Sequence, residues 1–168
     1  HSGCAQRADS GSCGECDALT FDFDEVLLET VGVGQAEYAV RQQVDTLVLV
    51  LIPNSGDIVQ AMKSGIMEMA DVFVVNKADL PGAQRMAADI QRITSLGKHT
   101  SSQWQAPVLL VSSTIPDSIA ELSLTIDRHQ EWIASTGERE RTALGRARYR
   151  LRRVIERQLI QVIDGLSE

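Results

Sequence analysis

The sequence predicts an α/β protein built on a parallel β-sheet, and two observations carry this prediction. The segments Asp45–Ile52 and Asp71–Val75 are apolar at almost every position, without the alternation of a strand that has one face in water. Segments with helical periodicity separate these runs, and strands that alternate with helices favour parallel pairing through right-handed crossovers. A chain of 168 residues is long enough to bury a core of this kind.

The expected elements alternate regularly along the chain. The first strand, Glu25–Glu29, is a short apolar run that we expect to be buried and to end on an acid. A glycine-bearing loop, residues 30–35, leads towards the second strand, residues 45–52, which is ended by Pro53–Asp57. The remaining elements are expected as a helix over 58–70, a strand over 71–75, a helix over 81–96, a strand over 107–111, a helix over 117–134 and a closing helix over 138–163.

Composition disfavours several classes of function. The formal net charge is −7, and such a surface disfavours nucleic acid as a partner, because phosphate binding needs basic residues. No apolar run approaches the ~20 residues that a membrane-spanning helix needs, so we expect no membrane partner. The chain starts at His1 without a signal peptide, which favours a cytoplasmic location.

All cysteines lie near the beginning of the chain, at Cys4, Cys13 and Cys16. The spacing of Cys13 and Cys16 is that of a metal or redox pair, but a structural zinc site needs further ligands, for which only Cys4 and His1 are at hand. The segment is otherwise rich in Gly and Ser. An irregular leader over residues 1–20 with reduced thiols is therefore the favoured interpretation.

The loop Asn76–Asp79, with the sequence N-K-A-D, directly follows a buried apolar strand. Ligands of open α/β sheets bind beyond the carboxyl ends of the strands. A carboxylate at Asp79 can accept hydrogen bonds from the ring nitrogen and the exocyclic amine of guanine, whereas adenine presents the opposite pattern. Asn76 can bond the other edge of the base, and the aliphatic stem of Lys77 can lie over the ring. The competing interpretation is an ordinary polar loop before a proline-initiated helix.

Two further strand ends carry groups that suit a nucleotide. Glu29 ends the first strand, and a carboxylate there favours a positive partner, for which magnesium held through a water is natural. Gly32 lets a backbone N–H approach a terminal phosphate, because no side chain blocks it. The backbone at Ser113, after the strand 107–111, can contact the carbonyl oxygen of guanine. Each signal is weak alone, and Glu29 can equally be an edge carboxylate that caps a turn.

Taken together, these residues resemble one family of GTP-binding proteins, the MeaB/ArgK GTPases. The segment Glu29–Glu37, E-T-V-G-V-G-Q-A-E, is similar to the family's E-T-V-G-V-G-Q-S-E. The resemblance covers residues 21–163 and implies a P-loop NTPase-like parallel sheet that lacks its first strands. Beyond the first segment it is carried by 44–45, 52–57, 63–71, 76–79, 119–122, 127–129 and the Arg-rich final helix.

The resemblance implies a role for each matching residue around the nucleotide. Glu29 would be the Walker B acid near magnesium, which it would hold through a water. Gly32 would sense the γ-phosphate of GTP. Asn76, Lys77 and Asp79 would read guanine. The cofactors implied are GTP or GDP and Mg²⁺.

The family also includes chaperones of adenosylcobalamin-dependent methylmalonyl-CoA mutase, which makes such a mutase the implied partner. Residues 52–63 resemble the mobile loop called switch III, through which the family couples nucleotide state to the mutase. Asp57 and Lys63 match the family in this loop. Asn54 and Ser55 depart from the family's usual Gly-Ala.

The resemblance divides the chain into the leader, a partial GTPase domain over residues 21–135 and a C-terminal helical extension over residues 136–168. The extension resembles the family's dimerisation region, so we expect a homodimer. The extension is rich in arginine, and a basic helix more often has a solvated face than a nucleic-acid site. An apolar stripe for packing or dimerisation is expected at Leu144, Leu151, Val154, Ile155, Leu159 and Val162.

No G-x-x-x-x-G-K-[ST] motif occurs in the chain, although that motif supplies most phosphate contacts in P-loop proteins. The implied function is hydrolysis of GTP to GDP by a chaperone of an adenosylcobalamin-dependent acyl-CoA mutase. Two alternatives stay open. One is a metal-insertion or transport-associated accessory GTPase, and the other is a non-catalytic module that dimerises through its last helix. Asp79 argues against the second alternative, and the missing motif argues for it.

Overall fold

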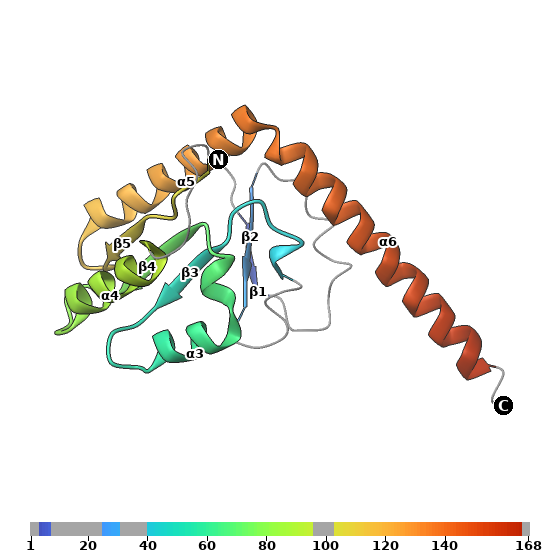
Figure 1. Ribbon diagram of the computed structural model, residues 1–168, viewed down its shortest axis with the longest axis horizontal. Coiled ribbons are helices and arrows are strands. Elements are labelled where there is room, and N and C mark those ends of the chain that lie inside the picture. Colours follow the sequence, from blue (N-terminus) through green and yellow to red (C-terminus); the bar gives the residue numbers. More distant parts are fainter. Residues whose placement is uncertain (1–3, 8–24, 31–39, 96–102, 166–168) are drawn as a thin grey trace.

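The computed structural model describes residues 4–7, 25–30, 40–95 and 103–165 of the chain (Figure 1). Most of these residues surround a parallel sheet, and the last helix extends away from it. The elements in order are β1 (Cys4–Arg7), β2 (Val26–Glu29), β3 (Val48–Leu51), α3 (Asp57–Ser64), the 3₁₀ helix η1 (Ile66–Glu68), β4 (Val72–Asn76), α4 (Ala83–Ser95), β5 (Val108–Val111), α5 (Pro116–Thr136) and α6 (Glu138–Gly165).

The central sheet is parallel and has the strand order β3-β4-β5. Val50 lies opposite Val74, and Val74 lies opposite Leu109, so side chains at paired positions share a face. The middle strand β4 is buried from Val72 to Val75, as its unbroken apolar run predicts. The expected α/β class with a parallel sheet is therefore confirmed, and the fold is P-loop NTPase-like.

Helices cover both faces of this sheet. On one face, Phe73 belongs to a buried cluster that includes Ile90 of α4 and residues of α3. On the other face, Val74 packs in a smaller cluster with Leu122 of α5. Figure 1 shows the same layering, with α3 and α4 on one side of the sheet and α5 on the other. This burial on both sides explains why β4 needs no polar face, whereas Val50 of β3 stays 51% exposed.

The strand β2 departs from the sequence prediction in two ways. It pairs in parallel with β1, in a separate two-stranded sheet, instead of joining β3, β4 and β5. It is also not buried, because Leu27 is 64% exposed and the side chains alternate between half-buried and exposed. A strand of four residues in which only alternate side chains are half-buried gains little from apolar burial. The partner β1 is itself a correction, since residues 1–20 were expected to be irregular.

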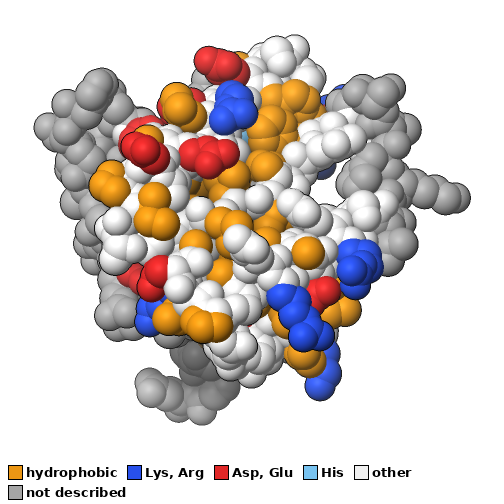
Figure 2. All heavy atoms as spheres, turned by 90° about the vertical axis from the view of Figure 1, so that its left-hand side faces the viewer, with side chains coloured by type: hydrophobic (Ala, Val, Ile, Leu, Met, Phe, Trp, Pro, Cys, Tyr) orange, Lys and Arg blue, Asp and Glu red, His pale blue; other side chains and the backbone are white. Residues whose placement is uncertain are grey.

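The carboxyl ends of the central strands lie on one side of the molecule, towards the left of Figure 1. Figure 2 views this side and shows apolar side chains in the middle of the face, with charged ones mostly around them. Leu80, in the loop after β4, and Ile115, at the start of α5, are exposed apolar residues of these loops. The edge where the sequence predicts a nucleotide therefore offers both apolar and charged contacts.

The last two helices meet at Gly137. Its φ of 73° is left-handed, a conformation that glycine adopts without strain, and α6 begins directly after it. In Figure 1, α6 runs away from the sheet. No helix within the described residues is long and apolar enough to span a bilayer. The large apolar side chains of α6 that are exposed are Leu144, Leu151, Val154, Ile155, Leu159 and Ile160.

Candidate functional site at the carboxyl edge of the sheet

The N-K-A-D loop begins at the end of β4 and is held by backbone hydrogen bonds. The N–H of Ala78 donates to the carbonyl of Val111 at 3.0 Å, which ties the loop to β5. Lys77 has a φ of 55°, a left-handed value that is uncommon for a residue with a side chain. Its N–H donates to the Asn76 side-chain oxygen at 2.7 Å. The loop therefore has a defined conformation before any ligand arrives.

Asp79 is positioned by a serine on the neighbouring strand end. Ser112 Oγ donates to Asp79 Oδ1 at 2.6 Å. Ser112 is 1% exposed, and its hydroxyl also contacts Thr114 Oγ1 at 2.8 Å. The hydrogen bond from Ser112, helped by the backbone N–H of Asp79 and by the charge of Lys77, lowers the pKa of the Asp79 carboxyl. Asp79 is thus an exposed carboxylate that is ionised at neutral pH and aimed by a buried partner.

The serine that contacts Asp79 is not the one that the sequence suggested. Ser113 is exposed, and its predicted contact with a guanine carbonyl is untested by the structure. Ser112 was missed because side chains alternate along a strand, so the first residue past β5 can point inward or outward. The available signal was the spacing of Ser112 and Thr114, which places two hydroxyls on one side of the turn.

The predicted switch residues lie on another part of this edge, the loop between β3 and α3. Asp57 is the first residue of α3, and its Oδ2 accepts a hydrogen bond from the N–H of Ile52 at 3.3 Å. Ser55 Oγ donates to the carbonyl of Ile52 at 2.6 Å. Lys63 is exposed in the last turn of α3. These contacts hold the loop internally, and within the described residues none of them joins Asp57 or Lys63 to Asp79.

The predicted phosphate and magnesium residues are only partly described. Glu29 is exposed at the end of β2, in the separate two-stranded sheet, and Gly32 lies outside the described residues. Mg²⁺ commonly takes one or two carboxylates together with substrate phosphates and waters. Glu29 fits as one such ligand, but nowhere in the described chain do three metal-ligating side chains come together. Cys13 and Cys16 also lie outside the described residues.

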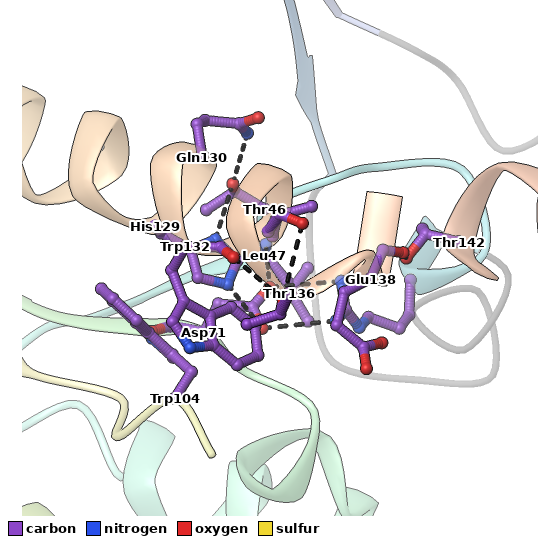
Figure 3. Close-up of polar contacts among 12 residues, drawn as sticks. Thr46, Leu47, Asp71, Trp104, His129, Gln130, Trp132, Thr136, Glu138 and Thr142 are labelled. Carbon is purple, nitrogen blue, oxygen red and sulfur yellow. Dashed lines mark hydrogen bonds and ion pairs between the residues drawn. The ribbon is translucent and has the colours of Figure 1, made fainter. Parts of the chain in front are cut away.

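A polar cluster occupies the opposite, amino-terminal edge of the sheet (Figure 3). At its centre, Asp71 Oδ2 accepts the N–H of Leu47 at 2.8 Å, and Arg41 lies 3.2 Å from the same oxygen. Burial raises the pKa of Asp71, although the Leu47 N–H, Arg41 and His129 each act to lower it. The indole N–H of Trp104 donates to the Asp71 backbone carbonyl at 2.7 Å.

His129 of α5 completes this cluster. Gln130 donates to Thr46 Oγ1 at 2.7 Å, and that hydroxyl lies 2.9 Å from His129 Nδ1. Because the Asp71 carboxylate can only accept, we assign the ring proton to Nε2, which lies 3.5 Å from Asp71 Oδ1, and Nδ1 then accepts from the Thr46 hydroxyl. Burial lowers the pKa of His129, with Asp71 acting in the opposite direction. The sequence pairs His129 with no acid, and only the fold brings it to Asp71.

The cluster is packed between aromatic rings and links α5 to the sheet. The ring centroids of Trp104 and His129 are 4.7 Å apart, and the Trp132 ring stacks on His129 at 5.9 Å. Both tryptophans are thus packing residues of this cluster. A pocket of about 400 Å³ opens beside them, with Arg41 and Glu68 among its lining residues. It lies away from Asp79, so it is not the predicted guanine site.

The comparisons with known proteins agree with this geometry. The family model described as "Methylmalonyl Co-A mutase-associated GTPase MeaB" matches residues 2–167. A probable GTPase of Mycobacterium tuberculosis is 40% identical over 119 residues, which are 69% of this chain and 35% of that protein. A putative GTPase of Pyrococcus abyssi is 37% identical over 148 residues, 87% of this chain and 43% of that protein.

A relative from mouse carries a more specific name. The "Methylmalonic aciduria type A homolog, mitochondrial" of Mus musculus is 38% identical over 119 residues, 69% of this chain and 29% of that protein. The chain thus spans less than half the length of each of these relatives. A P-loop NTPase-like sheet with an N-K-A-D loop at its carboxyl edge defines the class of GTPase-related α/β proteins. Within that class, the chain belongs to the MeaB family of methylmalonyl-CoA mutase-associated GTPases.

Proposed function

We propose that this chain is the guanine-reading part of a protein that hydrolyses GTP to GDP and acts as a chaperone for an adenosylcobalamin-dependent acyl-CoA mutase. One observation carries the proposal. Asp79 is an exposed, ionised carboxylate, and the buried hydroxyl of Ser112 holds it at 2.6 Å at the carboxyl edge of the sheet. Membership of the MeaB family and the names of the relatives support it.

Guanine recognition follows from the hydrogen-bonding capacity of Asp79. Its carboxylate accepts from the ring N–H and from the exocyclic amine of guanine. Adenine offers an acceptor at the ring nitrogen, which would leave both partners unpaired. Asn76 bonds the other edge of the base, and the Lys77 stem covers one face of the ring. The Ser113 backbone contacts the guanine carbonyl oxygen.

Hydrolysis needs groups that the rest of a longer protein would supply. Within the described residues, β3 has a hydrogen-bonded neighbour on one side only, which leaves its other edge open for a strand carrying a phosphate-binding loop. Glu29 would hold magnesium through a water, and Gly32 would contact the γ-phosphate. Magnesium, when bound, neutralises charge on the phosphate oxygens. The role of the protein is then to position the attacking water in line with the bond that breaks.

The partner and the assembly follow from two other regions. Asp57 and Lys63 couple the nucleotide to the mutase through the loop after β3. Exposed apolar side chains along α6, such as Leu151 and Leu159, support a homodimer, since a second copy would remove them from water. We place the protein in the cytoplasm, with no nucleic acid or membrane as partner.

The same helix favours a second candidate function. A module that dimerises through α6 and binds its partner without nucleotide also explains the exposed side chains of Leu151 and Leu159. This module has no use for the hydrogen bond between Ser112 and Asp79. Nucleotide binding therefore separates the two candidates.

The test is the binding of fluorescent GDP in the presence of Mg²⁺, competed by unlabelled GTP and ATP. We expect GTP but not ATP to compete, and Asp79→Ala to lose at least about 100-fold in affinity, because two charge-assisted hydrogen bonds disappear. Asp79→Asn is the matched variant: its amide keeps one acceptor and gains a donor, so it should prefer xanthosine diphosphate. A folded chain that binds no GDP, or that binds ATP equally well, refutes guanine recognition by this chain.

A further inference from the structure

Two loops at the carboxyl edge are joined by one side chain. The first loop, residues 52–57, follows β3, and the second, residues 77–82, follows β4 and carries Asp79. Asn54 at the tip of the first loop donates from Nδ2 to the carbonyl of Pro81 in the second, at 3.0 Å. The predicted switch loop and the predicted guanine loop therefore share a direct hydrogen bond.

The backbone around this bond is adapted to it. Asn54 has a φ of 65°, in the left-handed region that asparagine tolerates better than most residues. Gly82, next to the acceptor, has a φ of 93°, and a Cβ there would lie 3.3 Å from Asn54 Oδ1. Glycine at position 82 thus has two effects: it permits the backbone conformation, and it leaves room for the Asn54 amide.

Each loop is also tied internally, so a shift at one end of the bond is not absorbed within a loop. In the first loop, Ser55 Oγ holds the Ile52 carbonyl at 2.6 Å. In the second, the N–H of Leu80 donates to the Lys77 carbonyl at 2.9 Å, and the N–H of Met86 in α4 donates to the Gly82 carbonyl at 2.9 Å. The Pro81 carbonyl is thereby carried by a stretch with fixed geometry.

We propose that Asn54 is a positioning residue that couples the guanine loop to the switch loop, so that the base itself, independently of the terminal phosphate, biases residues 52–57. The inference rests on the proposed function for its ligand. Coupling of this kind is reciprocal, so the switch loop also affects the affinity for guanine.

The test compares two variants by hydrogen exchange of backbone amides. Asn54→Asp has nearly the same shape and tolerates the left-handed backbone, but it cannot donate to Pro81. Asn54→Gly keeps the backbone conformation and removes the side chain. Without nucleotide, we expect both variants to exchange the amides of Ala78, Leu80 and Ala83 about two- to fivefold faster than the unaltered chain, as the loss of one exposed hydrogen bond predicts.

Amides of α5 serve as the internal control, because the Asn54 side chain donates to Pro81 and the proposed coupling does not pass through α5. Unchanged exchange at 78–83 in both variants overturns the proposal without any reference to nucleotide. Faster exchange throughout the sheet also overturns it, since that result means general destabilisation.

A second arm adds saturating GDP or GTP with Mg²⁺. In the unaltered chain, both nucleotides should slow amide exchange in residues 77–83 and in residues 52–59. In Asn54→Asp, the nucleotides should still protect residues 77–83 but should no longer protect residues 52–59. Protection of 52–59 by GTP alone overturns the role of the base. Absence of GDP binding overturns the proposed function and the effect of the base together, whereas the first arm still decides whether the bond joins the loops.

Discussion

The two edges of the central sheet each carry an aspartate, and the two aspartates behave in opposite ways. At the carboxyl edge, Asp79 is exposed, and the hydroxyl of Ser112 lowers its pKa. At the amino edge, the Asp71 side chain is only 13% exposed, and burial raises its pKa. Because Asp79 is exposed, a ligand can replace the water around its carboxylate. The Asp71 carboxylate instead accepts hydrogen bonds from groups of the protein. The same side chain thus stabilises the fold at the amino edge and, in the function that we propose, recognises the base at the carboxyl edge.

The difference arises from what covers each edge. The carboxyl edge ends in loops, and its hydrogen bonds run mostly between neighbouring residues of these loops. At the amino edge, His129 of α5 and Trp104 close over Asp71 (Figure 3). A buried carboxylate is tolerated there because the Leu47 N–H and the Arg41 guanidinium supply donors. Substitutions at the two edges should therefore separate stability from binding.

The largest effect is expected for Asp71→Ala. It removes the acceptor of the Leu47 N–H and the partner of Arg41, leaving buried donors unpaired. We expect a loss of about 2–4 kcal/mol in the free energy of unfolding, measured by urea titration. The control is Asp89→Ala, since Asp89 lies on the surface of α4 and its ion pair with Arg92 is exposed. Equal losses in both variants would contradict a structural role for the amino edge.

A smaller effect, with a distinctive pH dependence, is expected for His129→Gln. Burial lowers the pKa of His129 below its ordinary 6.5, so the unfolded chain takes up the proton first as the pH falls. The stability that neutral His129 contributes is present above about pH 6.5 and is lost as the pH falls from there through the lower pKa of the folded state. Glutamine does not titrate, so the variant should lose less stability over this window.

At neutral pH the same variant should be less stable by about 1–3 kcal/mol, because the ring contacts and the bond to Thr46 are replaced imperfectly. The measurement is the melting temperature of both proteins at several pH values between 7.5 and 5. Asp71 faces His129, and because its pKa is raised, its titration changes stability with pH in the opposite direction at lower pH. Asp71 is present in both proteins, so this contribution does not distinguish them. If the melting temperatures of the two proteins change with pH by the same amount, the assignment of a buried neutral histidine is contradicted.

The smallest change in stability is expected for Asp79→Ala, although its effect on binding is expected to be large. Asp79 is exposed, and Ser112 keeps its contact with Thr114 at 2.8 Å when the carboxylate is gone. The free energy of unfolding should change by no more than about 0.5 kcal/mol, as for most surface substitutions. Urea titration without nucleotide measures this change. A loss as large as that of Asp71→Ala would mean that the two edges do not differ in the way described.

Much of the fold was predictable because it depends on local pattern. Unbroken apolar runs identified β3, β4 and β5 within a few residues, and Gly137 marked the junction of the last two helices. The prediction was wrong for β2, where the run Val26–Leu28 looked buried. Burial of so short a strand depends on which neighbour pairs with it, and the sequence of the strand contains no information about that neighbour.

The candidate site was predictable to a similar degree. The N-K-A-D motif placed Asp79 in a loop directly after a buried strand, as the structure has it, and its guanine-reading role stays a prediction. It did not identify Ser112, which is far away in the sequence and reaches Asp79 only because β4 and β5 are neighbours. The division of the chain into a leader, a partial GTPase domain and a helical extension stays a prediction, as do the roles of Glu29 and Gly32.

By itself, the sequence determined the α/β class, the parallel central strands and the loop that we expect to read guanine, since each depends on residues close together in the chain. Only the tertiary structure decided which groups become partners across the sheet. It placed Ser112 against Asp79, joined His129 to Asp71, and brought Asn54 to the carbonyl of Pro81. These contacts depend on the order and register of the strands, and strand order is settled by the packing of the whole sheet against its helices.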